Sequence, residues 1–270
     1  MKYNKNDYIK ESLPKTRFEL FIDIFKNQTR TLIVLALIAF LITLPLIIFH
    51  YYDKVIIDRI IASENYSVND IKTATIYNSL IFIGVMLLVS IFLAGIAKIY
   101  KKLTYNEGFV LAYTFSKSLK ENIKDYLIIG LIYGILSFVI KYIGISFIST
   151  NTMIYYLFIL INYLVLTPIT IVVFIVCSIY SDKIIKKIFV SIMLFFKYLH
   201  IVFAAYLILV LPLFALIFNN FFLHTIYLML YALFYLPFAL IIFELFIHYC
   251  LDKLINQTSF PDIYRKGLVS

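Results

Sequence analysis

Few residues of this chain could do chemistry inside a membrane, and two of them lie one helical turn apart. Glu244 is the only acidic residue within the long apolar segments of the sequence, and His248 follows it by four positions. That spacing places both side chains on one face of a helix, where a carboxylate and an imidazole could bind a proton or a cation. Ionisable residues inside apolar segments are functional candidates by default. The structural alternative is that Glu244, near the end of its segment, reaches head-group water or pairs with a lysine.

Four further residues within apolar segments could contribute to a site. Lys141 could be the counter-charge of a substrate, or its ammonium can reach the membrane surface by snorkelling. Asn162 can hydrogen-bond to a neighbouring helix, which is a structural role. Pro168 and Pro237 lie near the middle of their segments, and broken helices of this kind line transporter sites. Proline is also tolerated in membrane helices for packing alone, so both interpretations stay open.

The other reactive residues do not form a recognisable catalytic or metal site. Cys177 and Cys250 lie far apart, and the chain has neither a Cys-x-x-Cys motif nor clustered histidines. No serine or cysteine lies in a nucleophile setting. We therefore expect no enzymatic activity, no cofactor and no metal.

Composition and apolar run length predict the elements that position these residues. The chain of 270 residues is 63% hydrophobic and 14% charged, whereas a soluble domain has about 45–50% apolar and about 25% charged residues. A spanning helix needs roughly 20 apolar residues. Six segments qualify: 31–49, 76–97, 126–148, 153–179, 201–218 and 225–247. We predict an all-α polytopic membrane protein with six transmembrane helices in three hairpins. Within the third segment, Gly130 and Gly134 have the GxxxG spacing that permits close helix approach.

Charge predicts the orientation. Of the 24 Lys and Arg residues, 20 lie in 1–30, 98–125, 180–200 and 251–270, and four lie in the segments between them. By the positive-inside rule, both termini are cytoplasmic, and we expect a multi-pass protein of the plasma membrane. The domain organisation is then a cytoplasmic arm (1–30), a six-helix membrane domain (31–250) and a cytoplasmic tail (251–270). A basic surface at a membrane attracts anionic lipid head groups, and nucleic acid is not an expected partner.

A basic amphipathic stretch precedes the first, third and fifth apolar segments. In the first, Thr16 and Glu19 have the spacing of a capping box, which starts a helix. Thr104 and Glu107 have the same spacing in the second, and the third occupies 181–200. Each stretch has one apolar and one polar side, so we predict a cytoplasmic interfacial helix before each hairpin. The longest outer connection is expected at 50–75, and within it residues 53–63 could form a short amphipathic helix outside the membrane.

The lysines of the second and third stretches are the predicted surface for lipid or a protein partner. Such lysines can pack their stems on apolar surface while their ammonium groups reach the head groups. The residues are Lys117, Lys120, Lys124, Lys183, Lys186, Lys187 and Lys197.

Several of these features resemble the membrane domain found beside glycerophosphoryl diester phosphodiesterases, and its stand-alone six-span relatives. The resemblance lies in residues 20–45, an amphipathic stretch with Lys26-Asn27 before an apolar span, and in the basic stretch 181–200. It also lies in Leu236-Pro237 and in Tyr249-Cys250-Leu251-Asp252-Lys253. It covers nearly the whole chain. The phosphodiesterase barrel itself is absent, so the resemblance implies a membrane scaffold, an accessory subunit or a lipid-handling part.

The layout is also similar to permease subunits of ABC-2-type exporters, in which a cytoplasmic segment after the second span contacts an ATPase. Residues 98–125, with Glu107, could play that part, and ATP use would then come from the partner because the chain has no Gly-rich phosphate loop. Two hypotheses remain: a non-enzymatic scaffold or accessory module that contacts anionic lipid and partner proteins, and the permease subunit of such an exporter.

Overall fold

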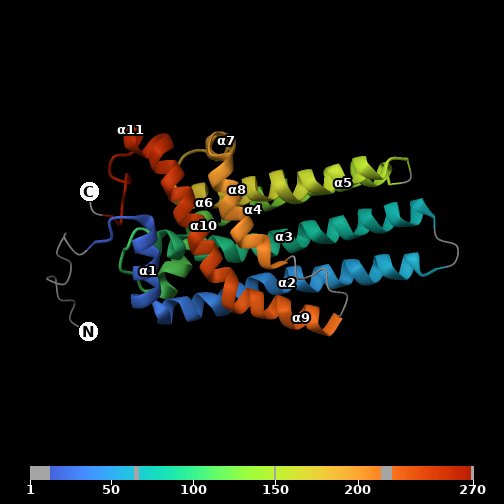
Figure 1. Cartoon of the computed structure of the whole chain (residues 1–270), viewed down its shortest axis with the longest axis horizontal. Helices are drawn as coiled ribbons and strands as arrows, with labels where there is room; N and C mark the ends of the chain where they lie inside the picture. Colours follow the sequence, from blue (N-terminus) through green and yellow to red (C-terminus); the bar gives the residue numbers. More distant parts are fainter. Residues whose placement is uncertain (1–12, 64–66, 149, 214–220, 269–270) are drawn as a thin grey trace. The chain divides into compact units, whose positions relative to one another are not determined.

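The computed structural model describes residues 13–63, 67–148, 150–213 and 221–268, and these ranges contain helices and turns but no strands. Figure 1 shows the helices in chain order. Their bounds are α1 (Arg17–Asn27), α2 (Thr29–Ile61), α3 (Val68–Thr104), α4 (Leu111–Ser146), α5 (Thr152–Ile161), α6 (Thr167–Ile179), α7 (Ile184–Lys197), α8 (Leu199–Val210), α9 (Phe221–Leu230), α10 (Leu236–Leu251) and α11 (Gln257–Ser259). Three π-helical turns interrupt the later helices: η2 (Asn162–Leu166), η4 (Tyr231–Tyr235) and η5 (Asp252–Asn256).

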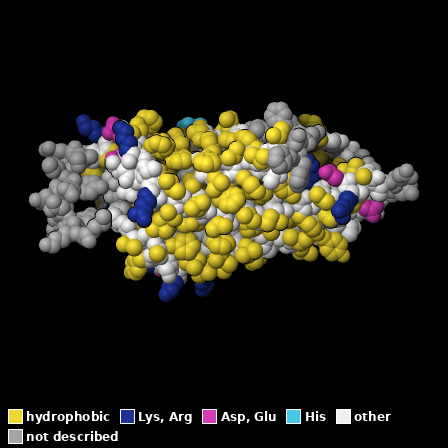
Figure 2. All heavy atoms as spheres, turned by 90° about the horizontal axis from the view of Figure 1, so that it is seen from below, with side chains coloured by type: hydrophobic (Ala, Val, Ile, Leu, Met, Phe, Trp, Pro, Cys, Tyr) yellow, Lys and Arg dark blue, Asp and Glu magenta, His cyan; other side chains and the backbone are white. Residues whose placement is uncertain are grey.

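The described helices are those of a multi-pass membrane protein. Five are long and apolar enough to cross a membrane, including the continuous runs Thr152–Ile179 and Leu223–Ser259. The bent pair α7 and α8, which turns by 95°, supplies up to one more span. Hydrophobic side chains cover most of the described surface in Figure 2, and Lys, Arg, Asp and Glu are few on that face. Residues 214–218 of the predicted fifth segment and residues 1–12 of the predicted arm lie outside the described ranges.

The predicted outer connection at 50–75 is mostly helical, and the helix expected at 53–63 is continuous with the apolar segment before it. Helix α2 continues to Ile61 and α3 already begins at Val68, so only 62–67 lie between them. Helices of 33 and 37 residues are about 50 and 55 Å long, which exceeds a hydrocarbon core of about 30 Å. Residues 51–75 contain neither Gly nor Pro, so no helix-breaking residue stops the helix where the apolar run ends.

The two predicted capping boxes have different outcomes. Thr16 is the N-cap of α1, and its hydroxyl accepts a hydrogen bond from the Glu19 amide at 3.1 Å. The second is wrong, because Thr104 is the last residue of α3. Asn106 has φ of 52° there, and the amides of Asn106 and Glu107 donate to the carbonyls of Leu103 and Lys102. These bonds form a Schellman motif, which ends a helix.

The interfacial helix predicted before the third span is also not separate. Helix α4 runs without interruption from Leu111 to Ser146, so the basic stretch and the apolar segment form one helix. By contrast, α1 and α7 are helices of their own.

The chain divides into two compact units. Unit 1 comprises 1–39, 96–116 and 192–270, and unit 2 comprises 40–95 and 117–191. In unit 1, α10 packs against α8 and α1 packs against α10, with Leu20, Phe243 and Ile247 fully buried. The hydroxyls of Tyr231 and Tyr235 donate to carbonyls near the end of α8, at 2.8 and 2.6 Å, and Tyr227 donates to the Pro212 carbonyl.

Unit 2 contains the close helix approach that the GxxxG spacing predicts. A Cβ atom added at Gly130 would lie 2.1 Å from the Ser90 Oγ and 3.2 Å from the Met86 carbonyl oxygen, and one at Gly134 would lie 3.0 Å from Ile83. Helix α4 therefore packs against α3 at these two glycines.

Pro168 and Pro237 each stand two residues after a π-helical turn. Proline cannot donate a backbone hydrogen bond and crowds the carbonyl four residues earlier. A π-helical turn relieves this conflict by lengthening the hydrogen-bond step. At the first site, the Asn162 carbonyl accepts both the Thr167 backbone amide and the Thr167 hydroxyl, the latter at 2.9 Å. Both helices thus continue through their prolines.

The double variant Gly130→Ala/Gly134→Ala should unfold at lower temperature than the wild type in detergent. Its two methyl groups overlap α3, and overpacking of this kind costs about 1–3 kcal/mol. Gly84→Ala is the matched control, because a Cβ atom there meets nothing within 4 Å. Equal melting temperatures for the two variants would contradict the close approach.

Candidate functional site

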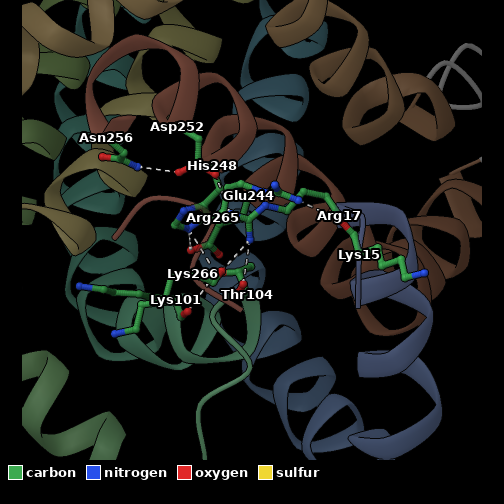
Figure 3. A network of polar contacts seen from close by, with 10 residues as sticks. All are labelled: Lys15, Arg17, Lys101, Thr104, Glu244, His248, Asp252, Asn256, Arg265 and Lys266. Atoms are coloured by element: carbon green, nitrogen blue, oxygen red, sulfur yellow. Dashed lines mark hydrogen bonds and ion pairs between the residues drawn. The ribbon is translucent and has the colours of Figure 1, made fainter. Parts of the chain in front are cut away.

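A stripe of buried polar side chains follows one side of α10 and η5. Its members are spaced by four residues, and each is at most 6% exposed: Glu244, His248, Asp252 and Asn256. Side chains four residues apart lie above one another on an α-helix. A π-helical turn has more residues per turn than an α-helical one, so η5 keeps the last two members on the same side. Figure 3 shows these residues together with those that contact them.

Arg17 joins three segments of unit 1 to this stripe. One guanidinium nitrogen pairs with the Asp252 carboxylate at 2.8 Å, and the other donates to the carbonyls of Thr104 and Lys266 at 3.2 and 3.1 Å. The second carboxylate oxygen of Asp252 accepts from the Asn256 amide at 2.9 Å. Both side chains of the ion pair are about nine-tenths buried. The N-cap at Thr16 fixes the start of α1 and thereby presents Arg17, its first residue, to these acceptors.

His248 is bound from two sides. Its Nε2 lies 3.2 Å from the Thr104 hydroxyl and 3.7 Å from a Glu244 carboxylate oxygen. The Thr104 hydroxyl also lies within donating distance of the Lys101 carbonyl, at 2.9 Å. The tautomer of His248 sets the direction of its bond to the hydroxyl. The Nδ1 atom, also buried, has no hydrogen-bond partner among the described residues.

Tyr105 closes the exposed side of the cluster. Its ring meets the His248 ring edge to face with centroids 4.9 Å apart, and the ammonium groups of Lys101 and Lys266 lie 5.7 and 5.2 Å from its centroid. Lys266 also pairs with Glu107 at 2.6 Å. The cluster thus combines the buried pair of Arg17 and Asp252 with the partly exposed pair of Lys266 and Glu107.

Two chemical roles are open to this arrangement: Glu244 and His248 can bind a proton, and Arg17 can join segments of unit 1. A buried carboxylate and an imidazole at 3.7 Å favour sharing one proton, because an unpaired buried charge is costly. Arg17 satisfies acceptors from the end of α3, from η5 and from the C-terminal segment, so it fixes α1 to all three.

The structure does not join all four predicted intramembrane residues. Glu244 and His248 meet in unit 1, whereas Lys141 and Asn162 belong to unit 2. The Asn162 amide donates to the Ser137 hydroxyl at 3.1 Å, which is the interhelical bond expected of it. The Lys141 ammonium lies 5.1 Å above the Phe82 ring.

The predicted lysine surface needs one correction. Lys187 is only 5% exposed and pairs with Asp125 of α4 at 2.6 Å, so it belongs to the interior of unit 2. Its position on the helix matches the buried face of α7, where Ser191 and Leu194 follow at helical spacing. The other members are exposed: Lys117, Lys120, Lys124, Lys183, Lys186 and Lys197.

Sequence reasoning missed most of the cluster around Arg17. The four-residue spacing from Glu244 to Asn256 was available as a signal, but the apolar segment ends near residue 247, and the stripe continues beyond it. The Arg17–Asp252 pair joins residues 235 positions apart, and no local pattern indicates it.

The comparisons add no relative. No family model matches the chain, and no match was found among curated proteins or solved structures.

Arg17→Gln should lower the stability of the protein by about 3–5 kcal/mol, because it leaves the Asp252 charge buried without its partner. The measurement is thermal unfolding in detergent. Lys186→Gln is the control, since it breaks the exposed pair with Asp182 at 3.0 Å, worth less than about 1 kcal/mol.

The double variant Arg17→Gln/Asp252→Asn removes both charges and should recover part of the loss, as coupled residues do. Additive losses in the double variant, or a single loss no larger than that of the control, would contradict a coupled buried pair.

Proposed function

We propose that this protein is a non-enzymatic membrane scaffold or accessory module that contacts anionic lipid and a partner protein. The observation that carries the proposal is that α1 and α7 each combine a buried side, an exposed apolar side and exposed basic residues. Helices with this distribution lie in the plane of the membrane interface. The resemblance to the membrane module of glycerophosphoryl diester phosphodiesterases is consistent with the proposal.

Helix α7 has the stronger features. Ile185, Phe189 and Phe196 recur at helical spacing and are 64–78% exposed, whereas Leu194 and Phe195 are buried. The exposed Lys186 and Lys197 lie between these two sides. The 95° bend between α7 and α8 supports an in-plane helix that leads into a spanning one.

Helix α1 also has an exposed apolar side and a buried side. Phe18, Ile22 and Phe25 are exposed along one side, while Leu20 and Ile24 are buried. The Phe25 ring also meets the Phe238 ring of α10, with centroids 5.6 Å apart. In the proposed arrangement, both helices lie at the cytoplasmic face of the plasma membrane, because the Lys and Arg residues concentrate in the segments around them.

The alternative, the permease subunit of an ABC-2-type exporter, has less support. In that hypothesis, residues 98–125 contact the ATPase, and Glu107 lies near the start of a helix. Glu107 instead lies in the turn after α3, and its carboxylate pairs with Lys266.

The proposal predicts that α7 prefers anionic lipid. Because the chain has no Trp, Phe189→Trp creates a single reporter, and brominated phosphatidylglycerol in nanodiscs should quench it more than brominated phosphatidylcholine. Adding Lys183→Gln, Lys186→Gln and Lys197→Gln should reduce this preference roughly tenfold or more, since each lysine near an anionic surface contributes about 1 kcal/mol.

The matched control removes three charges elsewhere, with Lys54→Gln, Arg59→Gln and Lys72→Gln, and should keep the preference. A preference unchanged by the α7 substitutions would refute the lipid surface. Co-purification of an ATP-hydrolysing subunit in mild detergent would replace the scaffold proposal with the permease alternative.

A further inference from the structure

We infer that the C-terminal turn (residues 260–268) positions helix α1 at the membrane interface. The inference rests on the proposed function, in which α1 contacts lipid. It assigns a positioning role to a segment that is bonded to the start of α1 through Arg17 and Arg265.

The turn reaches α1 through two backbone acceptors. The Lys266 carbonyl accepts from the Arg17 guanidinium at 3.1 Å, and the Lys15 carbonyl accepts from Arg265 at 3.4 Å. These bonds lie on either side of Thr16, the N-cap of α1. The turn therefore holds the start of the helix, which determines the direction in which Phe18 and the following exposed side chains point.

Gly267 lets the turn reach this position. Its φ is +86°, a conformation that L side chains rarely adopt. A Cβ atom there would lie 2.8 Å from the carbonyl carbon of Tyr105 and 3.0 Å from its Cα and oxygen. Backbone lies directly against backbone, so the contact cannot be relieved by moving a side chain. Only glycine permits this approach to the end of α3.

Polar contacts rather than apolar burial hold the turn. None of residues 257–268 is fully buried, and the Lys266–Glu107 pair at 2.6 Å is between partly exposed side chains. Arg265 has φ of 52°, and a non-glycine residue in this region costs of order 1–3 kcal/mol. A segment with few buried contacts opens at low free energy. The turn can therefore detach while the core of unit 1 stays folded, and α1 would then lose its fixed start.

Gly267→Ala tests the inference without changing a lipid-facing residue. Phe18→Trp places the only Trp of the chain on the exposed side of α1, and its quenching by brominated phosphatidylglycerol in nanodiscs reports lipid contact. We expect Gly267→Ala to remove most of this quenching. Hydrogen exchange, measured on the same samples, should rise in residues 15–27.

Two controls separate positioning from general destabilisation. Gly84→Ala adds the same methyl group in open space and should leave the quenching of Trp at position 18 unchanged. The reporter Phe189→Trp on α7 should be unaffected by Gly267→Ala. Glu107→Gln, which removes the exposed partner of Lys266, is a milder second variant and should act in the same direction as Gly267→Ala.

The outcomes distinguish the two proposals. Unchanged quenching and exchange at α1 in Gly267→Ala would overturn the inference, and so would equal losses at α1 and α7. If the Phe18→Trp variant alone shows no quenching by brominated lipid, lipid contact by α1 is rejected. In that case, exchange in residues 15–27 still decides whether the turn positions the helix.

Discussion

The requirement that every backbone polar group in lipid finds a partner within the protein governs this structure. It is most visible where helices end or change their hydrogen-bond step inside apolar sequence. Near the end of α8, tyrosine hydroxyls from α9 and η4 supply donors to three carbonyls. These Tyr residues of the apolar segments are thus partly explained by backbone carbonyls that need donors.

The same requirement, applied to charge, explains the cluster around Arg17. A guanidinium that is nine-tenths buried needs acceptors for several donors, and Asp252 with two backbone carbonyls accepts from both terminal nitrogens, whereas the buried Nε has no partner among the described residues. Each acceptor comes from a different segment, so binding this one side chain fixes the relative positions of α1, the end of α3, η5 and the C-terminal turn. Glu244 and His248 continue this polar stripe, and the same packing brings the carboxylate and the imidazole to 3.7 Å.

Sequence predicted the helical membrane class, the start of α1, and the glycine contact between α3 and α4. These features depend on local composition and spacing. It missed the continuity of α2 because apolarity marks the bilayer and not the helix, which continues through polar residues to Ile61. It mistook the end of α3 for a start, because Thr104 and Glu107 match a capping box, whereas Asn106 in a left-handed conformation decides the outcome. The partners of Arg17 and Lys187 are distant in sequence, and local patterns cannot supply them.

Helices α1 and α7 resemble each other in their exposed faces but differ in how they are held. Helix α7 is joined to α8 through a single residue at a 95° bend, and a part-buried ion pair between Lys187 and Asp125 fixes its inner side. Helix α1 has apolar packing on α10, but its first turn depends on Arg17 and on a C-terminal turn with little buried surface. Because local stability follows buried contacts, the two helices should respond differently to the same membrane. In the proposed arrangement, α7 would keep its lipid contact permanently, and the C-terminal turn would alter that of α1.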